Sequence, residues 1–454
     1  MNQISEMAID LSKLPPGPKP VIPLSNFIRF RRDSLGFLKK AAQEYGDVVY
    51  FKVGPLRMVL LNHPDFIKEV LSTQHSNFVK GRLFEMIKEV LGEGLLTSEG
   101  AFHKRQSRIM QPAFHHRMMS AYAPAMTEYA ARIMNGWQDG MKVDMMKEMV
   151  KMSTGIAAKT MFNVDMEKDA KEINEALEVI MGLFGRVTLP FAGFMLKLPL
   201  PGTLRFFKAK ALLDKTIFRI IEERRYSKLY NGDILSLLLQ TQEDPNSGGM
   251  SDLQIRDEAL TLFLAGFDTS SLAFIWTWYL LSQNPAAEAE LHEELDRVLQ
   301  GRMPTLEDNP RLKFTRMVIE ESMRLYPPIY MIVRQAMADF SVGKYVVPQG
   351  TIVLMSPYLI QRDARFHPNP EQFNPRNSAK CPGGQYQKYE YFPFSAGPRS
   401  CIGQQYAWLE GVMVLATIAQ NWRFTLLPEH PVEMAQLLNL RPKNGMMMRL
   451  HKRK

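Results

Sequence analysis

Phe392-Pro-Phe-Ser-Ala-Gly-Pro-Arg-Ser-Cys-Ile-Gly403 is the most distinctive stretch of this sequence. It holds Cys401, one of two cysteines in 454 residues, between Gly397 and Gly403. The mostly apolar run that follows, 404–419, is predicted to be a helix, so Cys401 lies in a glycine-bracketed loop that enters a helix. The amides and positive dipole of a helix start favour a thiolate there. A thiolate in such a loop is a good ligand for a soft metal ion.

A lone cysteine is also commonly a small buried apolar residue, but the context here is specific. The pattern Phe394-x-x-Gly397-x-Arg399-x-Cys401-x-Gly403 resembles the heme-binding loop of the cytochrome P450 family. The resemblance implies that the Cys401 thiolate is the proximal ligand of heme iron. It further implies that Phe394 packs near the sulfur and that Arg399 pairs with a heme propionate. Cys381 lies in a polar loop without this pattern and is not predicted to be a ligand.

Bulk composition limits the class of protein. The 46% hydrophobic content is sufficient for a large core, and two cysteines indicate no disulfide framework and a reducing compartment, so we expect a cytoplasmic protein. The net charge of +9 fits an anionic membrane surface or an acidic protein partner. No long basic block with interleaved aromatics occurs before the tail 451–454, so no nucleic acid is expected. No apolar span of about 18 residues opens the chain, so no integral membrane anchor is predicted.

A second motif lies about 130 residues earlier, in a predicted helix that starts at Ser251 and stops near Asn284. Its centre reads Ala265-Gly-Phe-Asp-Thr269, which places polar groups on an otherwise apolar helix. A threonine that bonds back to its own helix beside a locally paired aspartate is the ordinary explanation. In the family that the chain resembles, this pentad activates oxygen. The resemblance implies that Ala265 and Gly266 belong to the catalytic site, where the glycine opens a groove for O2, that Asp268 relays protons and that Thr269 holds the proton network.

Basic residues that could hold the heme propionates occur in two places. The stretch Phe102-His-Lys-Arg-Gln-Ser-Arg108 resembles the family's propionate-binding helix, with His103 in the first position but Ser107 where an arginine is usual. Arg105 or Arg108 could substitute for that arginine, and a surface histidine is an equally good explanation of His103. Arg334, after the run Tyr326-Pro-Pro-Ile-Tyr-Met-Ile-Val, matches a second propionate-binding arginine.

A third motif resembles the family's structural brace behind the heme loop. Glu321 and Arg324 are three residues apart on one face of a predicted helix. The third partner usually comes from Pro-x-x-Phe-x-Pro-x-Arg, but this chain reads Pro370-Glu-Gln-Phe-Asn-Pro-Arg-Asn377, with the arginine one residue early. We expect Arg376 to join the network. An exposed ion pair of little energetic value is the alternative reading.

The expected fold is mainly α with a smaller β lobe (α+β), the cytochrome P450 fold, with the long central helix over a buried heme. We expect 1–454 to form a single domain, with 1–13 as a flexible leader. The apolar run 177–207 is either a lid over the substrate or ordinary core, and a lid would also allow peripheral contact with a membrane.

The predicted function is a monooxygenase that inserts one atom of O2 into an apolar, lipid-like substrate. Heme b supplies the chemistry, and the electrons come from NAD(P)H through a separate ferredoxin or flavin-containing reductase. A heme-thiolate peroxygenase or isomerase is the first alternative, although the pair Asp268-Thr269 argues against it. A non-enzymatic heme sensor is the second.

Overall fold

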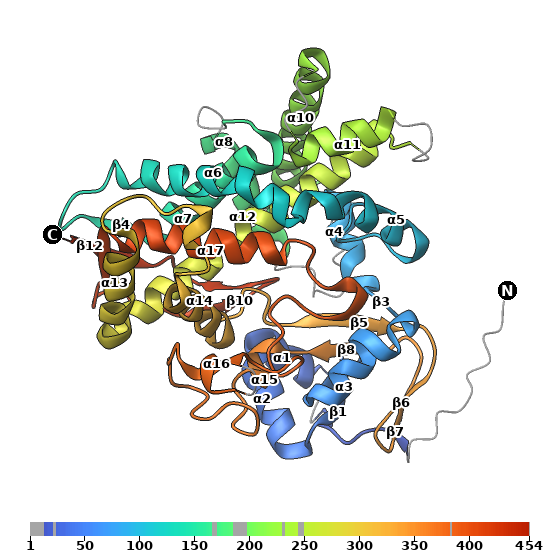
Figure 1. Ribbon diagram of the computed structural model, residues 1–454. Coiled ribbons are helices and arrows are strands. Elements are labelled where there is room, and N and C mark those ends of the chain that lie inside the picture. The colour runs from blue at the N-terminus through green and yellow to red at the C-terminus, as the bar shows by residue number, and fades with distance from the viewer. Residues whose placement is uncertain are drawn as a thin grey trace. The chain divides into compact units, whose positions relative to one another are not determined.

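The computed structural model describes residues 13–20, 24–165, 170–184, 198–228, 232–243, 249–381 and 384–453 (Figure 1). The first twelve residues of the expected leader, and the stretch 191–196 of the expected lid, lie outside these ranges. The chain divides into two compact units, each built from separate stretches of sequence. The first comprises Met1–Phe84, Ile329–Pro370 and Gln387–Ser400; the second comprises Glu85–Pro328, Glu371–Tyr386 and Cys401–Lys454. The expectation of a single domain stays a prediction.

The first unit is built on a five-stranded sheet in the order β1-β2-β8-β5-β3. Its strands are β1 (Val48–Val53), β2 (Leu56–Leu61), β3 (Phe78–Val79), β5 (Ile332–Ala336) and β8 (Ile352–Met355), and a separate pair joins β6 (Phe340–Val342) to β7 (Tyr345–Val347). The β1–β2 hairpin turns at Gly54-Pro55. Helical segments are α1 (Ser25–Arg32), α2 (Ser34–Tyr45), α3 (Pro64–Lys68), α15 (Pro357–Ile360), a π-helical turn (Glu69–Thr73) and 3-10 turns at His75–Asn77, Arg82–Phe84 and Gly397–Arg399.

Both faces of this sheet are packed, because side chains alternate along each strand. Val59 and Val353 belong to one buried cluster, and Leu60 and Leu354 belong to another. The first cluster also contains Ile332 of β5 together with Phe392 and Ala396 of the cysteine loop. One core therefore holds the strand that carries Arg334 and the first half of the cysteine loop.

The second unit is mainly helical. Its helices are α4 (Glu85–Leu91), α5 (Gly100–Met110), α6 (His116–Met134), α7 (Met145–Phe162), α8 (Ala170–Phe184), α10 (Pro201–Ser227), α11 (Ile234–Glu243), α12 (Asp252–Gln283), α13 (Pro285–Leu299), α14 (Lys313–Leu325), α16 (Asn377–Lys380) and α17 (Gln404–Ala419), with 3-10 turns at Gln111–Phe114 and Leu306–Asp308. Its strands are β4 (Lys142–Asp144), β9 (Trp422–Leu426), β10 (Met434–Gln436), β11 (Leu440–Pro442) and β12 (Met447–Lys452), in sheets ordered β4-β12-β9 and β10-β11. The predicted class, mainly α with smaller sheets, is confirmed.

Helix α12 has the start and stop that the sequence predicts. The Ser251 side chain accepts a hydrogen bond from the Gln254 amide, and the helix ends one residue before Asn284. Among the residues described, α12 is the one helix long and apolar enough to cross a membrane, and 72% of its most apolar window is buried inside the protein. That burial is what a core helix shows.

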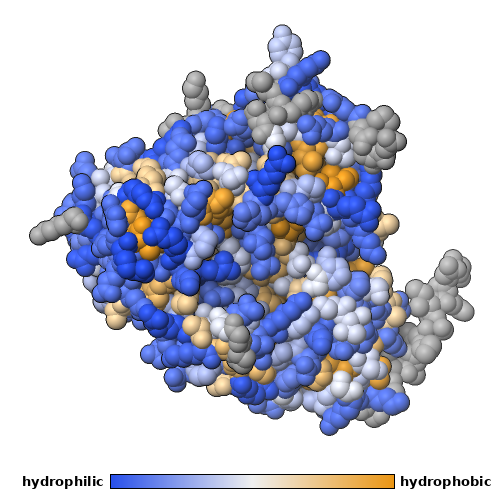
Figure 2. All heavy atoms as spheres, viewed as in Figure 1, coloured by the Kyte–Doolittle hydropathy of each residue, from blue (hydrophilic) through white to orange (hydrophobic). Residues whose placement is uncertain are grey.

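The surface is mostly hydrophilic on the face drawn in Figure 2, with hydrophobic side chains in separate patches. Leu198, Leu200, Leu204 and Phe207, around the start of α10, are exposed large hydrophobic residues. They belong to the part of the expected lid that the structure describes. Arg205 and Lys208 are exposed in the same stretch, so this surface is both apolar and basic.

Candidate functional site

Cys401 lies three residues before α17, as predicted. Cys401 as a whole residue is solvent-exposed. The protein packed around its sulfur nevertheless raises the pKa of the thiol by desolvation, while the Gly403 N–H lowers it. A Cβ on Gly403 would lie 3.9 Å from the Cys401 sulfur and 3.6 Å from the Phe114 ring, so the thiol has close neighbours in its own unit.

The preceding part of the loop belongs to the first unit. Gly397 has φ of 72°, and a Cβ there would lie 1.8 Å from the Leu71 carbonyl oxygen, so this position requires glycine. Phe394 and Arg399 are half-buried. Arg334 on β5 is 7% exposed and donates a hydrogen bond from Nη1 to the Val333 carbonyl at 2.8 Å. The roles of Phe394, Arg399 and Arg334 toward a heme stay predictions.

The centre of α12 presents an accessible strip of small side chains on an otherwise buried helix. Between Ile255 and Leu281 the one exposed residue is Ala265. Gly266, Thr269 and Ala273 are half-buried and follow Ala265 at helical spacing on the same face. The fourth half-buried residue of this range, Tyr279, lies further along the helix, after Ala273. The Thr269 hydroxyl donates to the Ala265 carbonyl at 2.8 Å, which is the back-bonding that a helical threonine often makes. A Cβ on Gly266 would lie 2.6 Å from the Met161 methyl, so α7 packs closely at this point.

Asp268 is buried and paired on both carboxylate oxygens. Arg441 donates from Nη2 to Oδ1 at 2.9 Å, and the Asn439 amide donates to Oδ2. Arg441 also donates from Nε to Asn439 Oδ1 at 2.9 Å, which orders both partners. Burial raises the pKa of Asp268, and the Arg441 guanidinium opposes that rise. The acid of the pentad is therefore held by β11 and the residue before it, which the sequence did not predict.

Helix α5 carries the two other predicted heme contacts of this unit. His103 is 9% exposed, so it is not a surface histidine. Arg105 donates from Nη2 to the Gly249 carbonyl at 2.5 Å, and Arg108 is exposed. At least one donor of Arg105 is thus committed to the backbone before α12. The propionate roles of His103 and Arg105 stay predictions.

The brace forms around Glu321, but with a different third partner from the one predicted. Arg324 donates to both Glu321 oxygens, at 2.7 and 2.8 Å, and both side chains are almost fully buried. Asn377 Nδ2 donates to Glu321 at 3.0 Å, and the Tyr386 hydroxyl also donates to Glu321, at 2.5 Å. Arg376 instead pairs with Glu290, with its side chain 61% exposed. The prediction for Arg376 is wrong, because the residue that reaches Glu321 is the one in the usual position of the motif, Asn377.

A buried contact between α12 and α17 was also missed. Ser270, next to Thr269, donates to Glu410 at 2.5 Å, and desolvation raises the pKa of Glu410 to about 8, against the opposing effect of the Ser270 hydrogen bond. One turn earlier on α17, Tyr406 shares a 2.9 Å hydrogen bond with Thr160 of α7. A single acid inside the apolar run Trp408-Leu-Glu-Gly-Val-Met413 was a signal that could have indicated Glu410.

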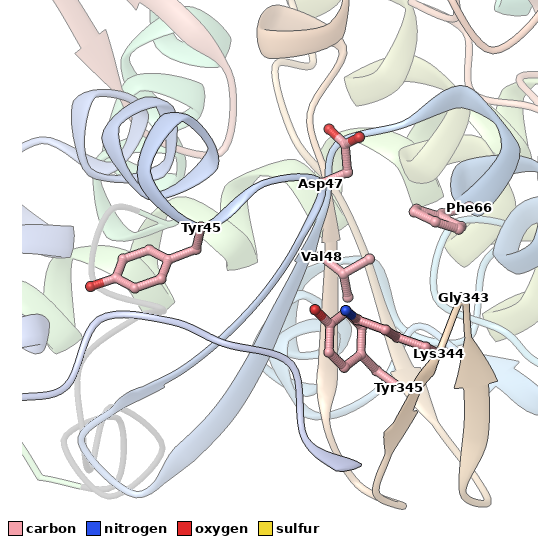
Figure 3. Close-up of a pocket in the computed structure, with 7 residues that line it drawn as sticks. All are labelled: Tyr45, Asp47, Val48, Phe66, Gly343, Lys344 and Tyr345. Carbon is pink, nitrogen blue, oxygen red and sulfur yellow. The ribbon is translucent and has the colours of Figure 1, made fainter. Parts of the chain in front are cut away.

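A surface pocket in the first unit contains none of the predicted site residues. It is lined by Tyr45, Asp47, Val48, Phe66, Gly343, Lys344 and Tyr345 (Figure 3). Asp47 already accepts two hydrogen bonds from Arg365, at 2.8 and 2.9 Å. The candidate site is therefore the set of residues around Cys401 and α12, and not this pocket.

Comparison with known proteins assigns the family. A family model described as cytochrome P450 matches residues 15–449. Cyclooctatin synthase of Streptomyces melanosporofaciens is 36% identical over 386 residues, covering 85% of this chain and 84% of that protein. Cyclooctat-9-en-7-ol 5-monooxygenase of the same organism is 34% identical (91% and 89% covered), and pentalenene oxygenase of Streptomyces avermitilis is 30% identical (94% and 95% covered). The chain therefore belongs to the cytochrome P450 family of heme-dependent monooxygenases.

Proposed function

We propose that this monooxygenase hydroxylates an apolar, terpenoid-like substrate, with the Cys401 thiolate as the iron ligand. One observation carries the proposal. The exposed residue Cys401 and the accessible strip Ala265–Thr269 belong to the same unit, although the helices that carry or follow them are almost entirely buried. These are the two elements that a heme with a proximal ligand and an open distal side requires.

The residues present fit a heme. Cys401 supplies a soft ligand before a helix start, and the small side chains of α12 leave space beside the helix axis. Arg334 and Arg399, with His103, are the cations proposed for the propionates. When bound, the heme supplies reductive O2 activation, and the protein supplies ligation, proton delivery and exclusion of water.

The polar residues of α12 are proposed to handle protons. Thr269 can exchange its bond to the Ala265 carbonyl for a hydrogen bond to a substrate or solvent oxygen beside the strip, because the two arrangements differ only in rotation about χ1. Asp268 is proposed to supply a proton when it is released from Arg441 and Asn439. In the pairing observed, its two oxygens accept hydrogen bonds and hold it in place.

The names of the relatives support the substrate class. They mention cyclooctat-9-en-7-ol and pentalenene as substrates of those enzymes, and we infer a molecule of similar apolar character here. We further propose a cytoplasmic enzyme that takes electrons from NAD(P)H through an acidic ferredoxin or flavin-containing reductase, which the net charge of +9 would attract. The exposed apolar and basic residues at the start of α10 support peripheral contact with a membrane surface.

A carbon monoxide difference spectrum of the reduced, heme-loaded protein tests the ligand. We expect the thiolate position for the wild type and for Cys381→Ser, which serves as the matched control. Cys401→His is expected to lose that band. A histidine-type band in the wild type would contradict the assignment of Cys401.

The same protein tests the reaction class. We expect substrate-dependent NAD(P)H consumption through a surrogate ferredoxin chain, with pentalenene as the first probe and binding spectra against other apolar compounds to follow. Turnover that is driven by hydrogen peroxide and indifferent to the redox chain would instead identify a peroxygenase.

A further inference from the structure

A second buried carboxyl group lies on α12, on the same side as the accessible strip. Glu258 and Thr261 precede Ala265 and Thr269 at spacings of three, four and four residues, so all four lie on one face of the helix. At about 1.5 Å per residue, Glu258 is roughly 16 Å along the axis from Thr269. Asp268 lies at the edge of this face, with both oxygens engaged by Arg441 and Asn439.

A glycine-rich turn covers Glu258 and Thr261. The Leu95 amide donates to Glu258 Oε2 at 2.8 Å, and the Glu93 amide donates to the neighbouring Asp257 at 2.9 Å. A Cβ on Gly94 would lie 2.1 Å from Thr261 Oγ1, so the turn can seat on the helix only because this residue is glycine.

The cover leaves spare hydrogen-bonding capacity beneath it. Glu258 is 0% exposed and Thr261 is 3% exposed. Glu258 Oε1 and Thr261 Oγ1 have no hydrogen-bond partner among the residues that the structure describes. Two unpaired polar atoms at adjacent positions of a buried helix face suit a bound water molecule, which needs such partners.

Glu258 is also suited to hold a proton. Desolvation raises the pKa of Glu258 to about 8, with a smaller contribution from Asp257, while the Leu95 N–H lowers it. The carboxyl group is thus uncharged at neutral pH, with one oxygen accepting from Leu95 and the other free to donate. The other charged groups of this junction are Arg256 on α12, Glu93 and Lys88 on the side of the turn, and Asp214 and Lys210 on α10.

We propose that Glu258 is a second proton donor for Thr269, and that Thr261, the water it binds and solvent beside the exposed Ala265 carry the proton along this face of α12. The inference rests on the proposed function. Splitting one O2, with one atom leaving as water, consumes two protons and two electrons, and the redox partner supplies the electrons. Glu258 gives up its carboxyl proton in the direction of Thr269 and regains one from solvent before the next turnover.

The test compares four variants of the heme-loaded enzyme. Glu258→Gln removes the proton and keeps the shape, and Thr261→Val removes the hydroxyl. Glu294→Gln is the matched control for a buried acid, since the amides of Phe314 and Thr315 and the Thr315 hydroxyl already satisfy Glu294. Thr277→Val is the control for a buried threonine on the same helix, since its hydroxyl bonds to the Ala273 carbonyl.

The first measurement is the fraction of NADPH electrons that end as hydrogen peroxide, with pentalenene as the probe and again with no added substrate. Loss of a proton donor diverts reduced oxygen to peroxide. We expect Glu258→Gln to lower the fraction of NADPH electrons that does not end as peroxide by about 10-fold or more. Thr261→Val should lower this fraction less, and the two controls should match the wild type. In the wild type, the fraction of electrons that does not end as peroxide should fall as pH rises through about 8, where Glu258 loses its proton. Glu258→Gln should lack that step.

The second measurement is the infrared difference spectrum of the resting wild type minus Glu258→Gln. An uncharged carboxylic acid band that shifts in D2O and changes in Thr261→Val is expected. A carboxylate band at pH 7 would overturn the proposal, as would unchanged peroxide release in Glu258→Gln. If the wild type lacked the thiolate carbon monoxide band, the proposed function itself would be contradicted. The two failures are therefore distinguishable.

Discussion

The Glu321 cluster and the face of α12 from Glu258 to Thr269 are both polar sites on helices of the second unit, and they differ in how they are paired. Glu321 accepts from Arg324, the Asn374 amide, Asn377 and Tyr386. On α12, Thr269 bonds within its own helix, and Glu258 and Thr261 keep atoms without a partner among the described residues. A fully paired carboxylate can only brace its surroundings, whereas spare donors and acceptors can serve a reaction.

The largest effect is expected from breaking the brace. Arg324→Met leaves the Glu321 carboxylate buried without its cation, and removing one partner of a buried pair costs about 3–5 kcal/mol. The free energy of unfolding from urea titrations measures this loss. A loss of less than about 1 kcal/mol, the range of an exposed pair, would show that the brace is no stronger than a surface contact.

The next effect separates Asn377 from its neighbour Arg376. Asn377→Ala removes a hydrogen bond to a buried carboxylate, which is worth about 1.5–3 kcal/mol. Arg376→Ala removes an exposed pair with Glu290 and should cost at most about 1 kcal/mol. Urea titrations of the two variants side by side check the assignment, and the reverse order would restore Arg376 as the third partner.

Local sequence patterns predicted what lies within one element. The capping residue Ser251, the stop near Asn284 and helix α17 all follow from propensities and capping residues close in sequence. Contacts between distant segments did not follow. Arg441 lies 173 residues from Asp268 and Glu410 lies 140 residues from Ser270, and no spacing rule connects such positions. The shift from Arg376 to Asn377 depends on the backbone path of one loop, which sequence spacing alone does not fix.

Glu410 combines a feature of each site, because its carboxyl group accepts a hydrogen bond from Ser270 and can still titrate. Its pKa in the folded chain is about 8 against an ordinary 4.5, so its contribution to stability is fully present below pH 4.5 and is lost as pH rises to about 8. Within that window the free energy of unfolding of the apoprotein should fall by about 1.4 kcal/mol per pH unit from this group.

The measurement for Glu410 is denaturant unfolding between about pH 5 and pH 9, a range that covers most of the expected loss of stability from this group. Glu410→Gln keeps a partner for Ser270 and removes the titration, so its slope should be shallower. Glu258, with a similarly raised pKa, contributes a slope of the same sign, and the variant therefore retains part of the pH dependence. Equal slopes in wild type and variant would mean that Glu410 is already ionised at low pH.

The smallest effect on stability is expected on the accessible strip itself. Ala265→Val adds two methyl groups to an exposed helical position, where lower helix propensity costs only about 0.5 kcal/mol. Ala211→Val on α10 is the matched control, because Ala211 is also exposed on a helix and lies away from the strip. If the strip borders the iron, carbon monoxide should bind the reduced heme protein several-fold more slowly in Ala265→Val and at the wild-type rate in Ala211→Val. Equal rates in both variants, with equal small losses of stability, would reduce Ala265 to an ordinary surface residue and leave α12 as a second brace.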